Sequence, residues 1–252
     1  MHYYTIPPFV HLGLDTKAEH YLTVAQWVER EEALFHFYKK RIQEGASVIL
    51  DNGQHEFREV YPIDKYLDMA KELGVEILVA PDVWGDSEKT AKVALDFWYS
   101  LSKEDKELFQ IMGVPHGKTL DEFMGCYHEL DMMDIIGLAK DEWGDKTGYI
   151  RAWMTHFLDE VDGSYDRFHL LGLNHVNELT CCNADTTRSF DTSLPYKAAM
   201  LNIKLHRIYE LSGKYEVQKK LAKSQEVIAL YNCNELRHWA KYPKDELWRK
   251  IE

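Results

Sequence analysis

Three aspartates stand where parallel strands would end. Asp51, Asp82 and Asp191 each follow a short run of apolar residues closely along the chain. In parallel α/β folds, ligands and reacting groups gather at the carboxyl ends of the strands. Further candidates at such ends are His116, Gly137 and Gly172. The six positions predict a shared site at one end of a sheet or barrel.

A pair of carboxylates has a defined use at an anomeric carbon. One carboxylate attacks C1′ and forms a covalent glycosyl intermediate, while the other transfers the proton of the leaving or entering group. Nucleobase exchange follows the same logic, with a base in place of water. An aspartate after a strand also commonly makes a turn or caps a helix, so each aspartate taken alone fits a structural role.

The segments between these residues alternate between helical periodicity and short apolar runs. Gly45 and Gly74 suit helix ends, where a left-handed backbone favours glycine. A capping box at residues 119–122 predicts another helix start. We expect helices at residues 20–44, 64–73, 88–101, 147–161 and 195–211 (with Gly213 as its stop), and strands at residues 47–50, 75–79, 108–112, 134–138, 168–172 and 187–190.

The number of alternating elements predicts the fold class. Residues 3–6 fit a first strand, and residues 227–231 fit either a last strand or part of a helix. Counting both gives close to eight β/α units in 252 residues. This favours an α/β fold, a (β/α)8 TIM-type barrel forming a single domain over residues 1–252. A doubly wound open sheet is the alternative.

Composition narrows the class of protein. The 45% hydrophobic content excludes a disordered chain. No apolar stretch of membrane-spanning length and no secretory signal is present, so we expect no membrane partner. The four cysteines are too few for a disulfide scaffold, which suits a reducing cytoplasm. The net charge of -12 argues against a general nucleic-acid coat.

Six segments, in order, carry a family resemblance. They are ILDNG, APDV, MGVPHG, IIGLA, HLLGLN and SFDTSLP, between about residues 46 and 200. This set resembles the tRNA-guanine transglycosylase superfamily, barrel enzymes that replace guanine with a 7-deazaguanine base. The resemblance covers roughly three-fifths of the chain and rests on the order and spacing of the segments rather than on any one of them.

The resemblance implies roles for individual residues. Asp191 matches the nucleophilic aspartate, Asp51 matches the aspartate linked to acid/base work, and Asp82 matches the one that reads the base edge. His116 stands near the family's base-contacting glutamine and is a candidate to replace it. The remaining substrate-binding candidates are Asn52, Gly137, Leu171, Gly172 and Lys197, the last as a contact to a flanking phosphate.

Differences from the tRNA enzymes indicate which branch of the superfamily the chain resembles. Those enzymes hold zinc with three cysteines and a histidine after the nucleophile, whereas only Cys233 follows Asp191 here, so we expect no metal, no cofactor and no zinc subdomain. The chain therefore resembles the compact, phage-type DpdA-like enzymes, which insert bases such as 7-cyano-7-deazaguanine into DNA and can shield it from restriction. The implied partners are DNA, guanine and a 7-deazaguanine base, in the cytoplasm or a phage host's cytoplasm; a partner protein or a homodimer stays open.

The charge is unevenly divided along the chain. Residues 197–252, a helical and more basic section, hold 12 Lys and Arg against 7 Asp and Glu. These cations fit either a phosphate track or a solvated helix face. Trp84, Phe57 and Tyr196 fit either base stacking or core packing. The cations of residues 197–252 include Lys214, Lys219, Lys220, Lys223, Arg237, Lys241, Lys244, Arg249 and Lys250.

Three rival functions remain at this point. A tRNA substrate is disfavoured by the missing zinc cysteines. A metal-dependent hydrolase would need a His-x-His pair after the first strand, which the chain lacks. A non-catalytic accessory or binding subunit would have lost the nucleophile, but both Asp191 and Asp51 are present.

Overall fold

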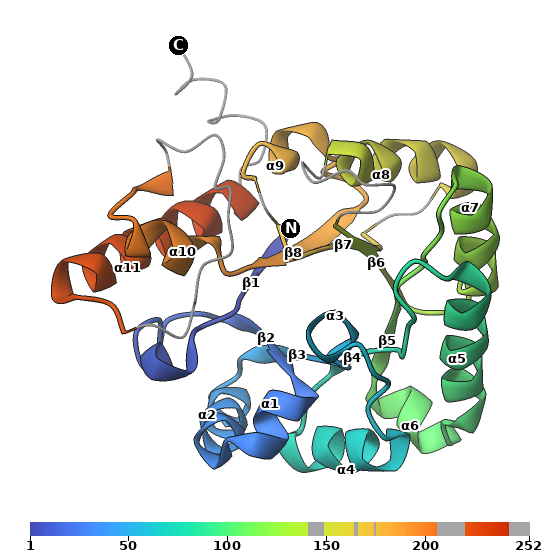
Figure 1. The fold of residues 1–252 in the computed structure, drawn as a ribbon, viewed down its shortest axis with the longest axis horizontal. Helices are drawn as coiled ribbons and strands as arrows, with labels where there is room; N and C mark the ends of the chain where they lie inside the picture. The colour runs from blue at the N-terminus through green and yellow to red at the C-terminus, as the bar shows by residue number, and fades with distance from the viewer. Residues whose placement is uncertain (141–148, 164–165, 174, 206–219, 242–252) are drawn as a thin grey trace. The chain divides into compact units, whose positions relative to one another are not determined.

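The computed structural model describes residues 1–140, 149–163, 166–173, 175–205 and 220–241. Eight strands follow one another around a closed barrel in the order β1 to β8, and helices flank them (Figure 1). The expected (β/α)8 TIM-type fold is confirmed, and the open doubly wound sheet is excluded. The chain divides into two compact units, residues 19–144 and residues 1–18 with 145–252.

The unit of residues 19–144 contributes five consecutive strands, paired in parallel from β2 to β6. Its elements are β2 (His20–Val24), α1 (Ala25–Arg30), α2 (Glu32–Gln43), β3 (Ser47–Asp51), α3 (Gln54–Phe57), α4 (Ile63–Leu73), β4 (Ile77–Val79), α5 (Ser87–Ser100), α6 (Lys103–Leu108), β5 (Gln110–Gly113), α7 (Leu120–Glu129) and β6 (Ile135–Ala139).

The other unit holds β1 and β7, each paired in parallel with β8. Its elements are β1 (His2–Thr5), the short 3-10 helix η1 (Phe9–His11), α8 (Tyr149–Asp162), β7 (Phe168–Leu171), α9 (Glu178–Cys181), β8 (Thr187–Thr192), α10 (Leu194–Met200) and α11 (Lys223–Lys241).

The strand β2 corrects the expected helix over residues 20–44. The run His20–Val24 is aromatic and β-branched, and it pairs with β3 so that Tyr21 lies opposite Val48. Four of its five residues are buried, as expected of a strand covered on both faces. The helical periodicity at Leu34 and Tyr38 is real, but it begins only after this strand.

Other boundaries also differ from expectation. The 227–231 run lies within α11, which settles that alternative as a helix. The helix after Pro195 ends at Met200, and Gly213 lies outside the described residues. Thr119 caps α7, but the Glu122 carboxylate accepts from the Lys118 N–H, so the capping box is incomplete.

In the second unit, α11 packs against α10 and β1, as Figure 1 shows for the two helices. The buried Asn232 side chain joins these elements: its Nδ2 donates to the carbonyls of Pro195 and Ile203, and its Oδ1 accepts from Leu205 N–H at 2.9 Å. Arg237 of α11 pairs with the buried Asp15. Arg237 is therefore committed to the fold rather than to a phosphate track.

Candidate active site

Asp191 lies within β8, where strand pairing on both sides fixes its backbone. It stands opposite Tyr4 of β1, and its side chain is 2% exposed. Burial of a carboxylate is costly unless hydrogen bonds replace its water. The neighbouring strand β7 and the loop after it supply these bonds.

Two N–H groups hold one oxygen of the Asp191 carboxylate. Gly172 N–H donates to Oδ1 at 2.9 Å, and His169 Nε2 lies 3.0 Å from the same oxygen. Among the described residues, Oδ2 has no hydrogen-bond partner. The carboxylate is thus fixed through one oxygen, while the other is available to a reacting atom.

His169 connects Asp191 to a second polar side chain. Its ring is fully buried, and its Nδ1 lies 2.7 Å from Ser189 Oγ. An ionised Asp191 only accepts hydrogen bonds, so Nε2 carries the proton and Nδ1 accepts from the Ser189 hydroxyl. Sequence reasoning did not select His169; its signal was a histidine within an otherwise apolar strand.

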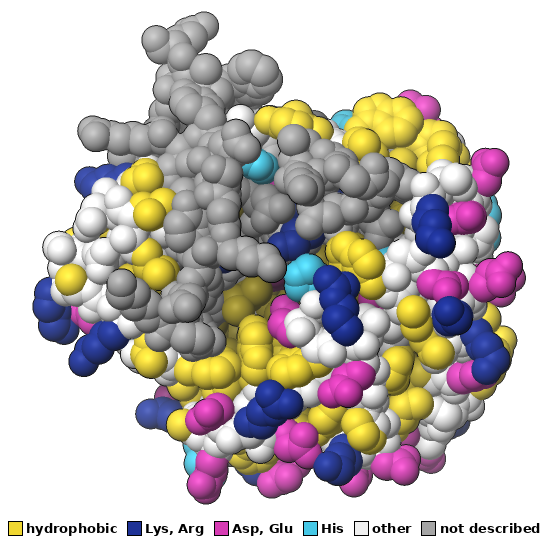
Figure 2. Space-filling model, in the orientation of Figure 1, with side chains coloured by type: hydrophobic (Ala, Val, Ile, Leu, Met, Phe, Trp, Pro, Cys, Tyr) yellow, Lys and Arg dark blue, Asp and Glu magenta, His cyan; other side chains and the backbone are white. Residues whose placement is uncertain are grey.

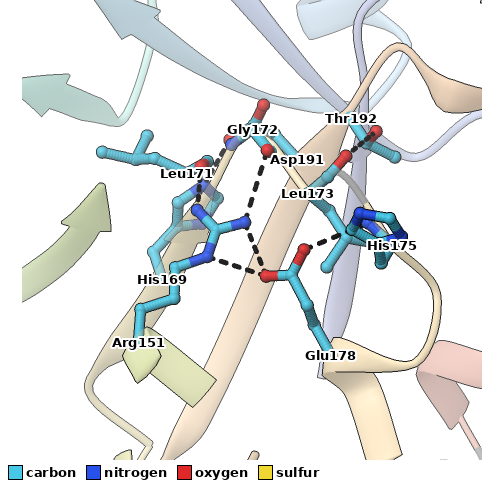
Figure 3. Close-up of polar contacts among 9 residues, drawn as sticks. All are labelled: Arg151, His169, Leu171, Gly172, Leu173, His175, Glu178, Asp191 and Thr192. Carbon is cyan, nitrogen blue, oxygen red and sulfur yellow. Dashed lines mark hydrogen bonds and ion pairs between the residues drawn. The ribbon is translucent and has the colours of Figure 1, made fainter. Parts of the chain in front are cut away.

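A buried ion pair holds the loop that carries the Gly172 N–H (Figure 3). Arg151 of α8 bonds Glu178 of α9, with Nε 2.8 Å and Nη2 2.7 Å from Oε2. The same guanidinium donates to the carbonyls of Leu171 and Gly172. Gly172 itself has φ +65°, a left-handed conformation that suits glycine.

Glu178 completes this arrangement from the other end of the loop. Its Oε1 accepts from His175 N–H at 3.1 Å, so one carboxylate binds both the guanidinium and the loop backbone. Arg151 is 4% exposed and Glu178 is fully buried. Two residues far from Asp191 in sequence therefore fix the backbone that holds its carboxylate.

A second cluster lies in the unit of residues 19–144, around Asp82. Asn52 Nδ2 donates to Asp82 Oδ1 at 3.0 Å and to the Ala80 carbonyl at 2.8 Å. His116, fully buried, lies with Nε2 2.8 Å from Asp82 Oδ2. The three sequence-predicted residues are thus brought together, with His116 and Asn52 orienting the aspartate.

Asp51 ends β3 beside this cluster. Its Oδ1 accepts from Gly53 N–H at 2.6 Å, and the residue is half-buried. The hydroxyl of the buried Tyr66 bonds the carbonyl ends of β3 and β4, at Leu50 and Val79. Burial raises the pKa of Tyr66 well above its usual value, and the charges of Asp51 and Asp82 raise it further. The Tyr66 hydroxyl therefore acts as a hydrogen-bond donor to the carbonyls at the ends of these two strands.

The other residues selected from the sequence lie on individual strands and helices, outside the two clusters described above. Gly137 is buried within β6, and Lys197 is half-buried on α10. Tyr196 is fully buried with its hydroxyl 3.4 Å from Thr5 Oγ1, so its role is core packing. Of the C-terminal cations, Lys214, Lys219, Lys244, Arg249 and Lys250 lie outside the described residues.

The described residues contain no group of three or more His, Cys, Asp or Glu side chains placed to hold a metal ion. None of the four cysteines forms a disulfide bond, and Cys181 is exposed while its neighbour Cys182 is buried. None of the helices in the described part of the chain is long and apolar enough to span a membrane.

Comparisons with known proteins do not identify a function for this chain. No known protein family matches the chain, and no curated protein matches it significantly.

The corner after Asp51 generates a first prediction. A Cβ on Gly53 would come within 2.2 Å of the Gln26 side-chain amide, and Gly53 has φ +77°. Gly53→Ala should therefore lower the free energy of unfolding by more than the ~1–2 kcal/mol of a left-handed alanine, as measured by urea denaturation. Gly45→Ala is the control, because Gly45 has φ +94° and open space around it. Equal losses in the two variants would contradict the close packing of Gln26 on Gly53.

The Arg151–Glu178 pair generates a second prediction. Arg151→Met leaves Glu178 buried without its cation and should cost about 3–5 kcal/mol of stability. The double variant Arg151→Met/Glu178→Leu should recover much of this loss, because no uncompensated charge remains. Denaturant titration measures both. Lys223→Met, which breaks an exposed pair with Glu226, is the control and should change stability little. A single-variant loss no larger than that of the control would refute the role of the buried pair.

Proposed function

We propose that this protein is a DNA guanine transglycosylase, exchanging guanine in DNA for a 7-deazaguanine base such as 7-cyano-7-deazaguanine. The observation that carries the proposal is the Asp191 carboxylate, buried and held through Oδ1 by two N–H donors while Oδ2 has no partner among the described residues. This geometry suits an enzyme nucleophile better than a turn or a helix cap, which would engage a backbone N–H further along the chain.

In the first step, Asp191 Oδ2 attacks C1′ of a deoxyguanosine. A C1′–O bond forms, the C1′–N9 bond breaks, and Asp51, which must be in its carboxylic acid form at this step, gives its proton to the departing guanine. Asp191 is then an ester whose carbonyl oxygen is Oδ1. The Gly172 and His169 N–H groups remain on this oxygen, where they stabilise the charge that returns when the ester is broken.

In the second step, the 7-deazaguanine base enters and gives its N9 proton to the Asp51 carboxylate. N9 attacks C1′, the ester bond breaks, and Asp191 is regenerated as a carboxylate. Two inversions at C1′ give net retention. Every proton is exchanged between Asp51 and a base, so the cycle is balanced without a further reactant.

Asp82 is the proposed reader of the base. A guanine-type edge presents N–H donors, and a carboxylate held by Asn52 and His116 is an oriented acceptor for them. His116 acts here by fixing Asp82 Oδ2. The target base must be flipped out of a duplex or already unpaired to reach such a site.

Base incorporation tests the proposal. Wild-type protein incubated with labelled 7-cyano-7-deazaguanine should place label in DNA and leave tRNA unlabelled. Asp191→Ala should lower incorporation by at least about 1,000-fold, since loss of a nucleophile removes the covalent route. Asp64→Ala, a change at an exposed aspartate at the start of α4, is the control and should retain activity.

Each alternative has its own result in this experiment. Label in tRNA alone would favour a tRNA-guanine transglycosylase. Label in neither polymer would favour a non-catalytic accessory or binding subunit. Wild-type incorporation by Asp191→Ala would refute the proposed nucleophile.

A further inference from the structure

Two exposed arginines lie on aromatic rings at the edge of α3. The guanidinium of Arg30 is 4.7 Å from the ring centroid of Phe57, and that of Arg58 is 5.0 Å from the ring of Trp84. Both rings are half-buried. We call these four residues the arginine–aromatic patch. In Figure 2, the surface over α3 shows hydrophobic, His and Lys or Arg side chains, with Asp or Glu side chains beside them.

Neither arginine is within ion-pair distance of a carboxylate among the described residues. Glu29, the acidic neighbour of Arg30, bonds Lys65 at 2.8 Å instead. Most other cations of the same unit are paired, namely Lys40, Arg41, Lys65, Lys71, Lys89, Lys92 and Lys103. In a chain of net charge -12, these two exposed arginines, each held against an aromatic ring, are therefore open to an anionic partner.

The aromatic contacts prepare these arginines to bind an anion. Stacking on a ring restricts the side chain while leaving N–H donors at the edge of the guanidinium. Arg58 also has φ +58°, a conformation unfavourable for a residue with a Cβ, and its N–H caps α3 at the Gln54 carbonyl. Strain of this kind persists where the surrounding structure requires the residue in one place.

The patch is continuous with the Asp82 cluster. The Trp84 ring is 5.5 Å from the His116 ring, centroid to centroid, and His116 bonds Asp82. Trp84 also contacts His55 at 5.3 Å. One ring therefore separates Arg58 from the residue that orients the proposed base reader.

Cations for phosphates together with aromatic faces for bases are the features of single-strand nucleic-acid sites. We propose that the arginine–aromatic patch binds the backbone of single-stranded DNA next to the target nucleotide. This inference rests on the proposed function for the choice of DNA. Glu56 and Glu59 flank Arg58 in sequence, so affinity here depends on the two guanidinium groups rather than on a broad positive field.

The salt dependence of binding tests the patch directly. Each phosphate contact to a single strand contributes about 0.7 to the slope of log K against log salt. Arg30→Gln/Arg58→Gln should therefore reduce the slope by about 1.4, measured by fluorescence anisotropy with a labelled oligodeoxynucleotide. All proteins carry Asp191→Asn, so that binding is not complicated by covalent adducts.

The chain supplies a matched control. Lys39 lies over Phe35 and Lys106 over Trp98, again one Phe and one Trp in the same unit. Lys39→Gln/Lys106→Gln removes the same charge and should leave the slope unchanged. Thermal melting confirms that both double variants are folded.

An unchanged slope in the arginine variant, or an equal reduction in the lysine control, would overturn the inference. So would an arginine-dependent slope for single-stranded RNA of the same sequence but not for DNA. If wild-type protein labels DNA and the arginine variant keeps the full slope, the inference that the patch binds DNA is wrong and the proposed function stands. If the slope falls as expected but DNA acquires no label, the proposed function is wrong and the inference that the patch binds DNA stands.

Discussion

The hydrogen bonds to Asp191 Oδ1 are the constraint on which the rest of the site depends. A buried carboxylate needs donors, and the two donors here are the imidazole of His169, which β7–β8 pairing brings beside Asp191, and the backbone N–H of Gly172 in the loop after β7. That loop is in turn held by Arg151 and Glu178. The Asp191 carboxylate is therefore positioned by strand pairing on one side and by a buried ion pair on the other.

Other buried carboxylates in the chain are also held by specific side chains. Asp82 is oriented by an amide and an imidazole, and Asp15 by Arg237 of α11. On the surface, a carboxylate lies within ion-pair distance of Lys40, Lys65, Lys71, Lys89, Lys92 and Lys103. At the edge of α3, Arg30 and Arg58 have no such ion pair among the described residues, although Glu56 and Glu59 lie close in sequence. An acidic protein can bind nucleic acid when a few cations are kept unpaired at the place where phosphates arrive.

The sequence was sufficient for the alternation of strands and helices, because apolar runs and helix-ending glycines such as Gly74 are local signals. It failed at His20–Val24, where an aromatic, β-branched strand adjoins a helix without a separating turn. Asn52, Asp82 and His116 could be selected from their places after strands. His169 and Arg151 were not selected, because their partners lie 22 and 27 residues away and meet them only through strand pairing and helix packing.

The most direct measurement is the site of covalent attachment. Protein incubated with a guanine-containing oligodeoxynucleotide and no incoming base, then denatured and digested, should yield one peptide bearing a deoxyribosyl strand through Asp191, identified by tandem mass spectrometry. An adduct on Asp51, on Asp82 or on no residue, in a preparation that exchanges bases, would contradict the account.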